Sequence, residues 1–296
     1  LLPIPADTII GLYHPYRDLY VSQYPNGIPF KNFLITDPVR QQYPWRQISI
    51  NSFKNLELPI WNPYSFTGTP LLANVQSGVF YPLNVLFIFL PFEISWSVLI
   101  LLEPLLASVF IFAYLRNLKL DKYSSFFGAI IFSFSGFFTT WLEWGTILHV
   151  GLWLPLILFS IDKIRFNIKD NRQIFIWSII LIFSTVSSFF AGHLQIFFYL
   201  SLVGAIYVIL RIWQSRNKKL AGIFFITWLI TLMVVSIQLV PALKFILLSA
   251  RDLDQILWQK DGWFIPWQHL VQFISPDFFG NPTTLNYWGV WNYGEL

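Results

Sequence analysis

The sequence of 296 residues contains no cysteine, and only 11% of its residues are charged. The absence of cysteine excludes disulfide bonds and thiolate metal sites. Soluble domains carry about 25% charged residues, more than twice the share found here. Hydrophobic residues make up 55% of the chain and aromatic residues 20%, and the mean hydropathy is +0.57. This composition predicts a protein that lies in a lipid bilayer rather than one that folds around an aqueous core.

Several motifs of soluble enzymes are also missing. The sequence has no phosphate-cradling glycine-rich loop, no His-Glu-x-x-His and no nucleophile elbow, so a cytoplasmic nucleotide-driven enzyme is unsupported. The formal charge of +4 is typical of basic cytoplasmic loops, and we expect no nucleic-acid partner. The chain begins at Leu1 without methionine or a basic leader. We therefore expect it to be part of a longer protein, with at least one membrane span before it.

Six charge-poor segments are long enough to cross a bilayer. A transmembrane helix needs about 20 apolar residues, because the hydrocarbon core is about 30 Å thick. The predicted spans lie near 94–115, 123–141, 145–162, 173–190, 195–212 and 220–243. The shorter apolar stretch 79–92 contains two prolines and predicts an interfacial or re-entrant helix. A further short helix is expected at about 39–55.

Basic residues set the orientation of these spans. Three short connections carry three, four and four Lys or Arg residues, whereas the alternate connections 139–147 and 190–195 carry none. By the positive-inside rule the basic connections are cytoplasmic, so both ends of the chain lie outside. We therefore predict an all-α polytopic membrane protein with three parts. These are an outer loop at 1–82, a six-helix bundle at 83–248 and a Trp-rich outer loop at 249–296.

Asp37 is the leading candidate for catalysis. It lies in the first outer loop just before Pro38, and Arg40 and Arg46 follow it. A carboxylate there could accept a proton or bind a divalent cation, and the arginines could hold a phosphate by forked hydrogen bonds. Asp is also a common N-cap, so the spacing alone is equally explained by a helix that starts at Pro38. Asp18 is a second outer carboxylate, whose simpler interpretation is a solvated loop residue.

Ionisable residues within or beside the spans are the second group of candidates. Glu103 interrupts the first span and should face the bundle interior. Alternatively, it is a protonated side chain bonded to backbone that Pro104 leaves free. Glu143 and His149 flank an outer turn, either as part of a site or as an interfacial rim. His193 lies at the tip of a helical hairpin, where it either faces a cavity or caps a helix.

Several motifs are spread in order along nearly the whole chain. They are Leu34–Asp37 with Gln42–Arg46, Leu58–Tyr64, Gly68–Pro82, Ala191–Gln195, Gln238–Pro241 and Ser275–Pro282. Together they resemble the YfhO family of bacterial polytopic membrane proteins, and Gly68–Pro82 is the most specific of them. Val75 and Leu194 depart from the family pattern, which has proline at both places.

The resemblance implies a core similar to that of the GT-C superfamily of membrane glycosyltransferases. Those enzymes take sugar from a polyprenyl-phosphate donor at the outer face of the membrane, using an acidic residue of the first outer loop. Asp37 matches that residue by motif, and Arg40 or Arg46 would stabilise the leaving phosphate. The implied acceptor is a cell-envelope polymer and the implied location is the bacterial cell membrane. The other candidates for substrate binding in these motifs are Trp45, His193 and Gln195.

Two other functions remain open on the sequence alone. A transporter or flippase for lipid-linked sugar could use Glu103, His149 and His193 along its path. Its outer loops would be longer than transport needs, and no inverted repeat is visible. A non-catalytic protein for envelope-polymer assembly would instead tolerate the loss of Asp37.

Overall fold

The computed structural model describes residues 37–142, 144–248, 266–280 and 286–289. By their internal contacts these residues belong to two compact units. The first unit runs from Arg40 to Leu243 and contains the membrane helices together with the loop that precedes them. The second contains residues 37–39 and the described residues from Lys244 onward.

Five helical stretches in the described part of the chain are long and apolar enough to cross a membrane. They are α4 (Phe92–Asn117), α7 (Ile147–Gly151) continued by α8 (Leu154–Phe166), α9 (Asn171–Phe190), α10 (Leu194–Ser215) and α11 (Lys218–Leu247). Each agrees within a few residues with a span predicted from the charge-free runs. The sequence-based expectation of an all-α membrane bundle is confirmed at this level.

The remaining predicted span, 123–141, is not one continuous helix. It consists of α5 (Lys122–Ser133) and α6 (Gly136–Trp141), separated by a turn at Phe134 and Ser135. Twelve residues of α5 rise only about 18 Å, which is well short of a bilayer core. The prediction of a single span over 123–141 is therefore wrong, because apolar composition carried no information about the turn.

Small side chains explain why α5 lies closely along α4. The buried residues of α5 are Ser125, Ala129 and Ser133, spaced one helical turn apart. Ser133 also accepts a hydrogen bond from Ser108 of α4, with 2.8 Å between the two hydroxyl oxygens. Small residues at a helix interface let two backbones approach closely, which is a common way to join helices within lipid.

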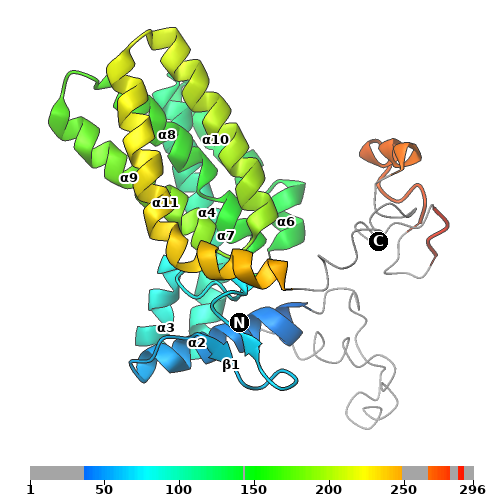
Figure 1. The fold of residues 1–296 in the computed structure, drawn as a ribbon. Helices are drawn as coiled ribbons and strands as arrows, with labels where there is room; N and C mark the ends of the chain where they lie inside the picture. Colours follow the sequence, from blue (N-terminus) through cyan, green and yellow to red (C-terminus); the bar gives the residue numbers. More distant parts are fainter. Residues whose placement is uncertain (1–36, 143, 249–265, 281–285, 290–296) are drawn as a thin grey trace. The chain divides into compact units, whose positions relative to one another are not determined.

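The α7–α8 segment is the centre of the bundle. In its most apolar stretch 67% of the residues are buried, compared with 6% in α10. Leu148, Leu152, Ile161 and Ile164 are at most 1% exposed and form the middle of the core. α4, α9 and α10 pack around this segment, as Figure 1 shows. The outer faces of α9, α10 and α11 carry exposed Phe, Leu and Ile side chains, as expected for helices that contact lipid.

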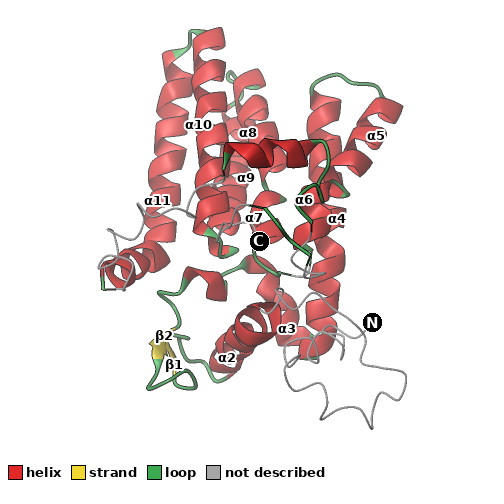
Figure 2. Ribbon diagram, turned by 90° about the vertical axis from the view of Figure 1, so that its right-hand side faces the viewer, coloured by secondary structure: helices red, strands yellow, loops and turns green. Residues whose placement is uncertain are grey.

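The loop before α4 folds into short elements at one end of the bundle (Figures 1 and 2). A π-helical turn, η2 (Pro38–Gln42), leads into α2 (Tyr43–Lys54), which confirms the helix expected at 39–55. Strands β1 (Trp61–Asn62) and β2 (Thr69–Pro70) then form an antiparallel hairpin. The stretch 79–92 contains two further short helices. The remaining elements of the loop are η3 (Val75–Ser77), η4 (Pro82–Val85) and α3 (Leu86–Phe89).

In the second unit the described C-terminal residues form an aromatic cluster. The ring of His269, in the 3-10 helix η6 (Trp267–Phe273), stacks on Phe279 at 4.9 Å between centroids. Trp288 packs against the same Phe279 ring at 4.9 Å. Among the Trp residues of this region, Trp288 is thus held by ring packing, whereas Trp267 is exposed.

The orientation of the helices can be tested by labelling single cysteines, since the chain has none of its own. Tyr64 in the hairpin is 80% exposed, and Lys169 lies in the exposed connection between α8 and α9. The distribution of basic residues predicts that Tyr64→Cys reacts with a membrane-impermeant maleimide in intact cells. Lys169→Cys should react only after the cells are permeabilised.

Equal labelling at the two positions would contradict this topology. It would also show that α5 and α6 together fail to cross the membrane, because three crossings separate the two residues in the predicted arrangement.

Candidate functional site

Glu103 and His149 form a buried carboxylate–imidazole contact at the centre of the candidate site. Glu103 lies on α4 directly before Pro104, and His149 lies on the short helix α7. Glu103 Oε1 is 2.9 Å from His149 Nε2, and the two side chains are 0% and 1% exposed. The prediction that Glu103 faces the bundle interior is confirmed. Its partner is an imidazole, rather than backbone freed by the proline.

Arg46 brings a third ionisable group into the same region. It comes from α2, in the loop before the helices, yet it is only 1% exposed. Its Nη2 donates a hydrogen bond to the carbonyl oxygen of Gly145 at 3.0 Å, and its guanidinium lies 5.6 Å from the Trp96 ring centroid. Burial lowers the pKa of Arg46 to about 10, while Tyr81 and Glu103 oppose part of that shift. The side chain therefore remains protonated at neutral pH.

Tyr81, in the loop before α4, packs against His149. Its ring centroid lies 4.8 Å from that of His149, and the residue is 2% exposed. Burial, followed by the negative charge of Glu103, raises the pKa of the Tyr81 hydroxyl far above its usual range. Tyr81 therefore contributes a neutral polar group beside the charged residues.

Two glycines with positive φ allow the loop to pack this closely. Gly78 has φ +58°, and a Cβ atom there would lie 2.9 Å from Arg46 Nη2. Gly192 has φ +102°, and a Cβ atom there would lie 2.8 Å from the carbonyl oxygen of Val75. A side chain at either position would therefore displace the contacts between the loop and the bundle.

Hydrogen bonds join the same segments. Gln42 Nε2 donates to Gln76 Oε1 at 3.2 Å, and Gln238 Nε2 donates to the carbonyl oxygen of Leu72 at 3.0 Å. Four of the motifs singled out in the sequence thus meet at one end of the bundle. They are Gln42–Arg46, Gly68–Pro82, Ala191–Gln195 and Gln238–Pro241. The sequence shows the order of these motifs along the chain, but it does not show that they are in contact in the folded protein.

Some buried polar atoms of this region have no hydrogen-bond partner in the described part of the chain. They include Arg46 Nε, Gln42 Oε1, His149 Nδ1 and Gln238 Oε1. Native proteins leave only a few such atoms unsatisfied, and their concentration at one place is typical of a site that binds a polar ligand or water.

The other predicted residues lie apart from this cluster. Asp37 is half-buried and directly precedes η2, at the start of the described residues. It belongs to the second compact unit, whereas Arg40 is exposed at the start of the first. Trp45 is half-buried on α2. Asp18 and Glu143 lie outside the described residues.

His193 and Gln195 begin helix α10. His193 is its N-cap, and its Nδ1 accepts a hydrogen bond from the backbone N–H of Ile196 at 3.4 Å. Burial lowers the pKa of His193, so the ring is neutral near pH 7. The exposed Gln195 donates to the Tyr199 hydroxyl at 3.1 Å. These contacts agree with the capping interpretation of His193. No group of three or more His, Asp or Glu side chains with metal-binding geometry occurs among the described residues.

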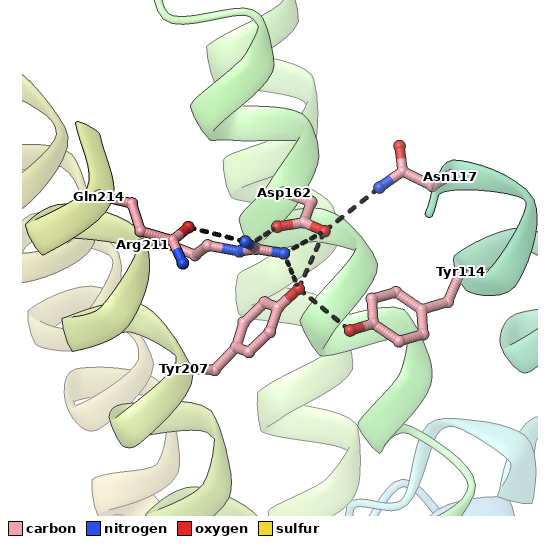
Figure 3. Close-up of polar contacts among 6 residues, drawn as sticks. All are labelled: Tyr114, Asn117, Asp162, Tyr207, Arg211 and Gln214. Carbon is pink, nitrogen blue, oxygen red and sulfur yellow. Dashed lines mark hydrogen bonds and ion pairs between the residues drawn. The ribbon is translucent and has the colours of Figure 1, made fainter. Parts of the chain in front are cut away.

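The structure also contains an ion pair that the sequence interpretation missed (Figure 3). Asp162 of α8 is fully buried, and its Oδ1 lies 2.7 Å from Arg211 Nε of α10. Its Oδ2 accepts hydrogen bonds from Arg211 Nη2 at 3.1 Å, Tyr207 at 2.9 Å and Asn117 of α4 at 3.3 Å. Tyr114 of α4 donates in turn to the Tyr207 hydroxyl at 3.0 Å. The hydrogen bonds to Oδ2 come from α4 and α10, and the ion pair at Oδ1 comes from α10, so this cluster joins three helices.

No role for Asp162 was predicted from the sequence. The residue lies at the end of a predicted span, and the basic residues near it served only to predict the orientation of the helices. The spacing of Tyr207 and Arg211, one helical turn apart on α10, was the available signal. It indicated two polar side chains on the same face of a membrane helix.

The Asp162 cluster should be a main contributor to stability. Asp162→Asn removes the carboxylate charge and leaves Arg211, 17% exposed, without a counter-charge. The cost should be below the figure of about 3–5 kcal/mol for a fully buried pair, because water can reach the guanidinium. Tyr207→Phe removes one hydrogen bond and should cost about 1 kcal/mol. Thermal unfolding of the detergent-solubilised protein measures both effects.

Asp170→Asn is the matched control, since Asp170 caps α9 through the backbone N–H groups of Arg172 and Gln173 and Asn caps equally well. Asp162→Asn and Asp170→Asn proteins of equal stability would show that the cluster does not join the helices as described.

Comparisons of the chain with protein-family models, with curated proteins and with solved structures find no match. The resemblance to the YfhO family therefore stays a prediction.

Proposed function

We propose that this protein transfers a sugar from a polyprenyl-phosphate donor to an acceptor of the bacterial cell envelope, at the end of the bundle where Arg46 lies. The observation that carries the proposal is the burial of Arg46 at 1% exposure beside a membrane bundle. A protonated guanidinium away from water is costly unless anionic groups surround it. A buried guanidinium of this kind would favour an anion that reaches it.

The chemistry of a lipid-phosphate donor suits this site. As the bond from sugar to phosphate breaks, negative charge builds on the leaving phosphate, and a guanidinium stabilises that charge by forked hydrogen bonds. The interaction is stronger where water is excluded. The exposed Arg40, at the start of the same helical segment, is placed to meet the phosphate from solvent.

Asp37 is the proposed base of the reaction. It would take the proton of the acceptor hydroxyl as that oxygen attacks the sugar, or hold the hydroxyl through a divalent cation. Its motif and its place before α2 support this assignment. Trp45, His193 and Gln195 remain candidates for contact with the sugar or the acceptor.

The ion pair of Glu103 and His149 favours a second candidate function, proton-coupled movement of a lipid-linked sugar. Paired ionisable residues inside membrane segments are typical of transport pathways. Transport predicts that the labelled sugar crosses the membrane still attached to its lipid, whereas transfer predicts a labelled acceptor polymer.

Asp37→Asn tests the assignment of the base. Asn has nearly the shape of Asp but cannot take up a proton, so sugar transfer from a radiolabelled polyprenyl-phosphate donor should fall by roughly two orders of magnitude or more. Expression and thermal stability should stay near those of the wild type.

Asp18→Asn and Asp170→Asn are the controls for this experiment. Asp18→Asn should reduce transfer less, and the capping change Asp170→Asn should leave it unchanged. Loss of transfer with Asp18→Asn but not with Asp37→Asn would move the base to Asp18. Normal transfer in both variants would rule out an outer-loop carboxylate as the base.

A further inference from the structure

Three ionisable side chains from separate parts of the chain share one buried region. Arg46 comes from α2, Glu103 from α4 and His149 from α7, and none is more than 1% exposed. Glu103 Oε1 lies 2.9 Å from His149 Nε2, and Glu103 interacts electrostatically with Arg46. The charges of these three groups therefore depend on one another.

The region is neutral when His149 is neutral. If Glu103 is ionised, protonated Arg46 balances its charge, and Tyr81 adds none. The helices that pack on α4 and α7 place no further net charge near the cluster, as far as their residues are described. Serines line the buried end of α9, His193 caps its own helix, and Tyr43 of α2 stays protonated because burial, followed by Glu93, raises its pKa. Asp162 of α8 is neutralised separately by Arg211.

An anion that reaches Arg46 upsets this balance. One added negative charge leaves the region with a net negative charge, and an uncompensated buried charge is costly. His149 can restore neutrality. When its Nε2–H donates to ionised Glu103, its Nδ1 is an acceptor, and this atom is buried without a partner among the described residues.

We infer that a phosphate anion binds at Arg46 together with one proton, which is taken up by the Glu103–His149 pair. The proton comes from solvent and bonds to His149 Nδ1, giving an imidazolium that Glu103 stabilises through Nε2–H. No bond to the anion forms or breaks in this step. The inference rests on the proposed function for the choice of a lipid phosphate as the anion.

Linkage gives the sign of the pH dependence. If binding takes up a proton, lower pH must favour binding, by up to roughly tenfold in affinity per pH unit for one proton. The dependence disappears at pH values where the free protein already carries that proton.

The test uses methyl farnesyl phosphate, a prenyl phosphodiester whose single negative charge does not titrate near neutral pH. Calorimetric titration of the detergent-solubilised protein, in two buffers with different ionisation enthalpies, gives the number of protons taken up per anion. We expect a value approaching one for the wild type near neutral pH or above, and an affinity that falls as pH rises.

Three variants separate the contributions. His149→Gln should take up no proton and should bind with an affinity independent of pH. Glu103→Gln should also take up none, but it should bind more tightly than the wild type at high pH, because Arg46 then has no internal counter-charge. Asp170→Asn, at an exposed cap on a different helix, should behave as the wild type.

The outcomes distinguish this inference from the proposed function. Wild-type binding without proton uptake, or unchanged uptake in His149→Gln, overturns the inference and leaves anion binding intact. No binding in the wild type overturns both. Binding that persists in Arg46→Gln with normal proton uptake shows that the anion lies elsewhere and overturns the inference.

Discussion

Charges held away from water must be balanced within this protein, and much of its architecture follows from that constraint. Glu103 and Asp162 both lie within membrane helices and are both 0% exposed. Each carboxylate has a basic partner on a different helix, His149 in one case and Arg211 in the other. An ion pair of this kind adds little net stability compared with apolar packing, but losing one partner is strongly destabilising. The pairs therefore act mainly to fix which helices lie together.

The two pairs differ in the hydrogen bonds around them, since Asp162 accepts three and Glu103 contacts one imidazole. Asp162 has partners on both carboxylate oxygens, supplied by α4 and α10. Nothing in that cluster requires a ligand. The Glu103 pair instead adjoins a buried arginine with an unsatisfied Nε and an imidazole with an unsatisfied Nδ1. A partly satisfied polar cluster is costly for folding alone, so its retention points to binding or proton transfer.

The sequence predicted the membrane helices well because hydrophobic length is a local property. Five spans agree with the structure, and the inward position of Glu103 followed from the cost of exposing an acid to lipid. The break at Phe134 and Ser135 could not be predicted, since apolar composition is the same on both sides of it. The burial of Arg46 could not be predicted from the sequence either. It depends on contacts with Gly145 and Gly78, which lie far away in sequence and carry no signal of their partner.

The candidate site around Arg46 forms only where the loop before α4 packs against the helix bundle. Arg46 and Tyr81 belong to the loop, whereas Glu103 and His149 belong to helices. Neither half is complete alone, because the helices would bury a carboxylate and an imidazole without the arginine, and the loop would leave the arginine in water. Gly192 lies at the closest approach of the bundle to the loop, and Gly78 leaves room within the loop for the Arg46 side chain. Small shifts of the loop at these glycines would therefore change the surroundings of Arg46 without altering the helices.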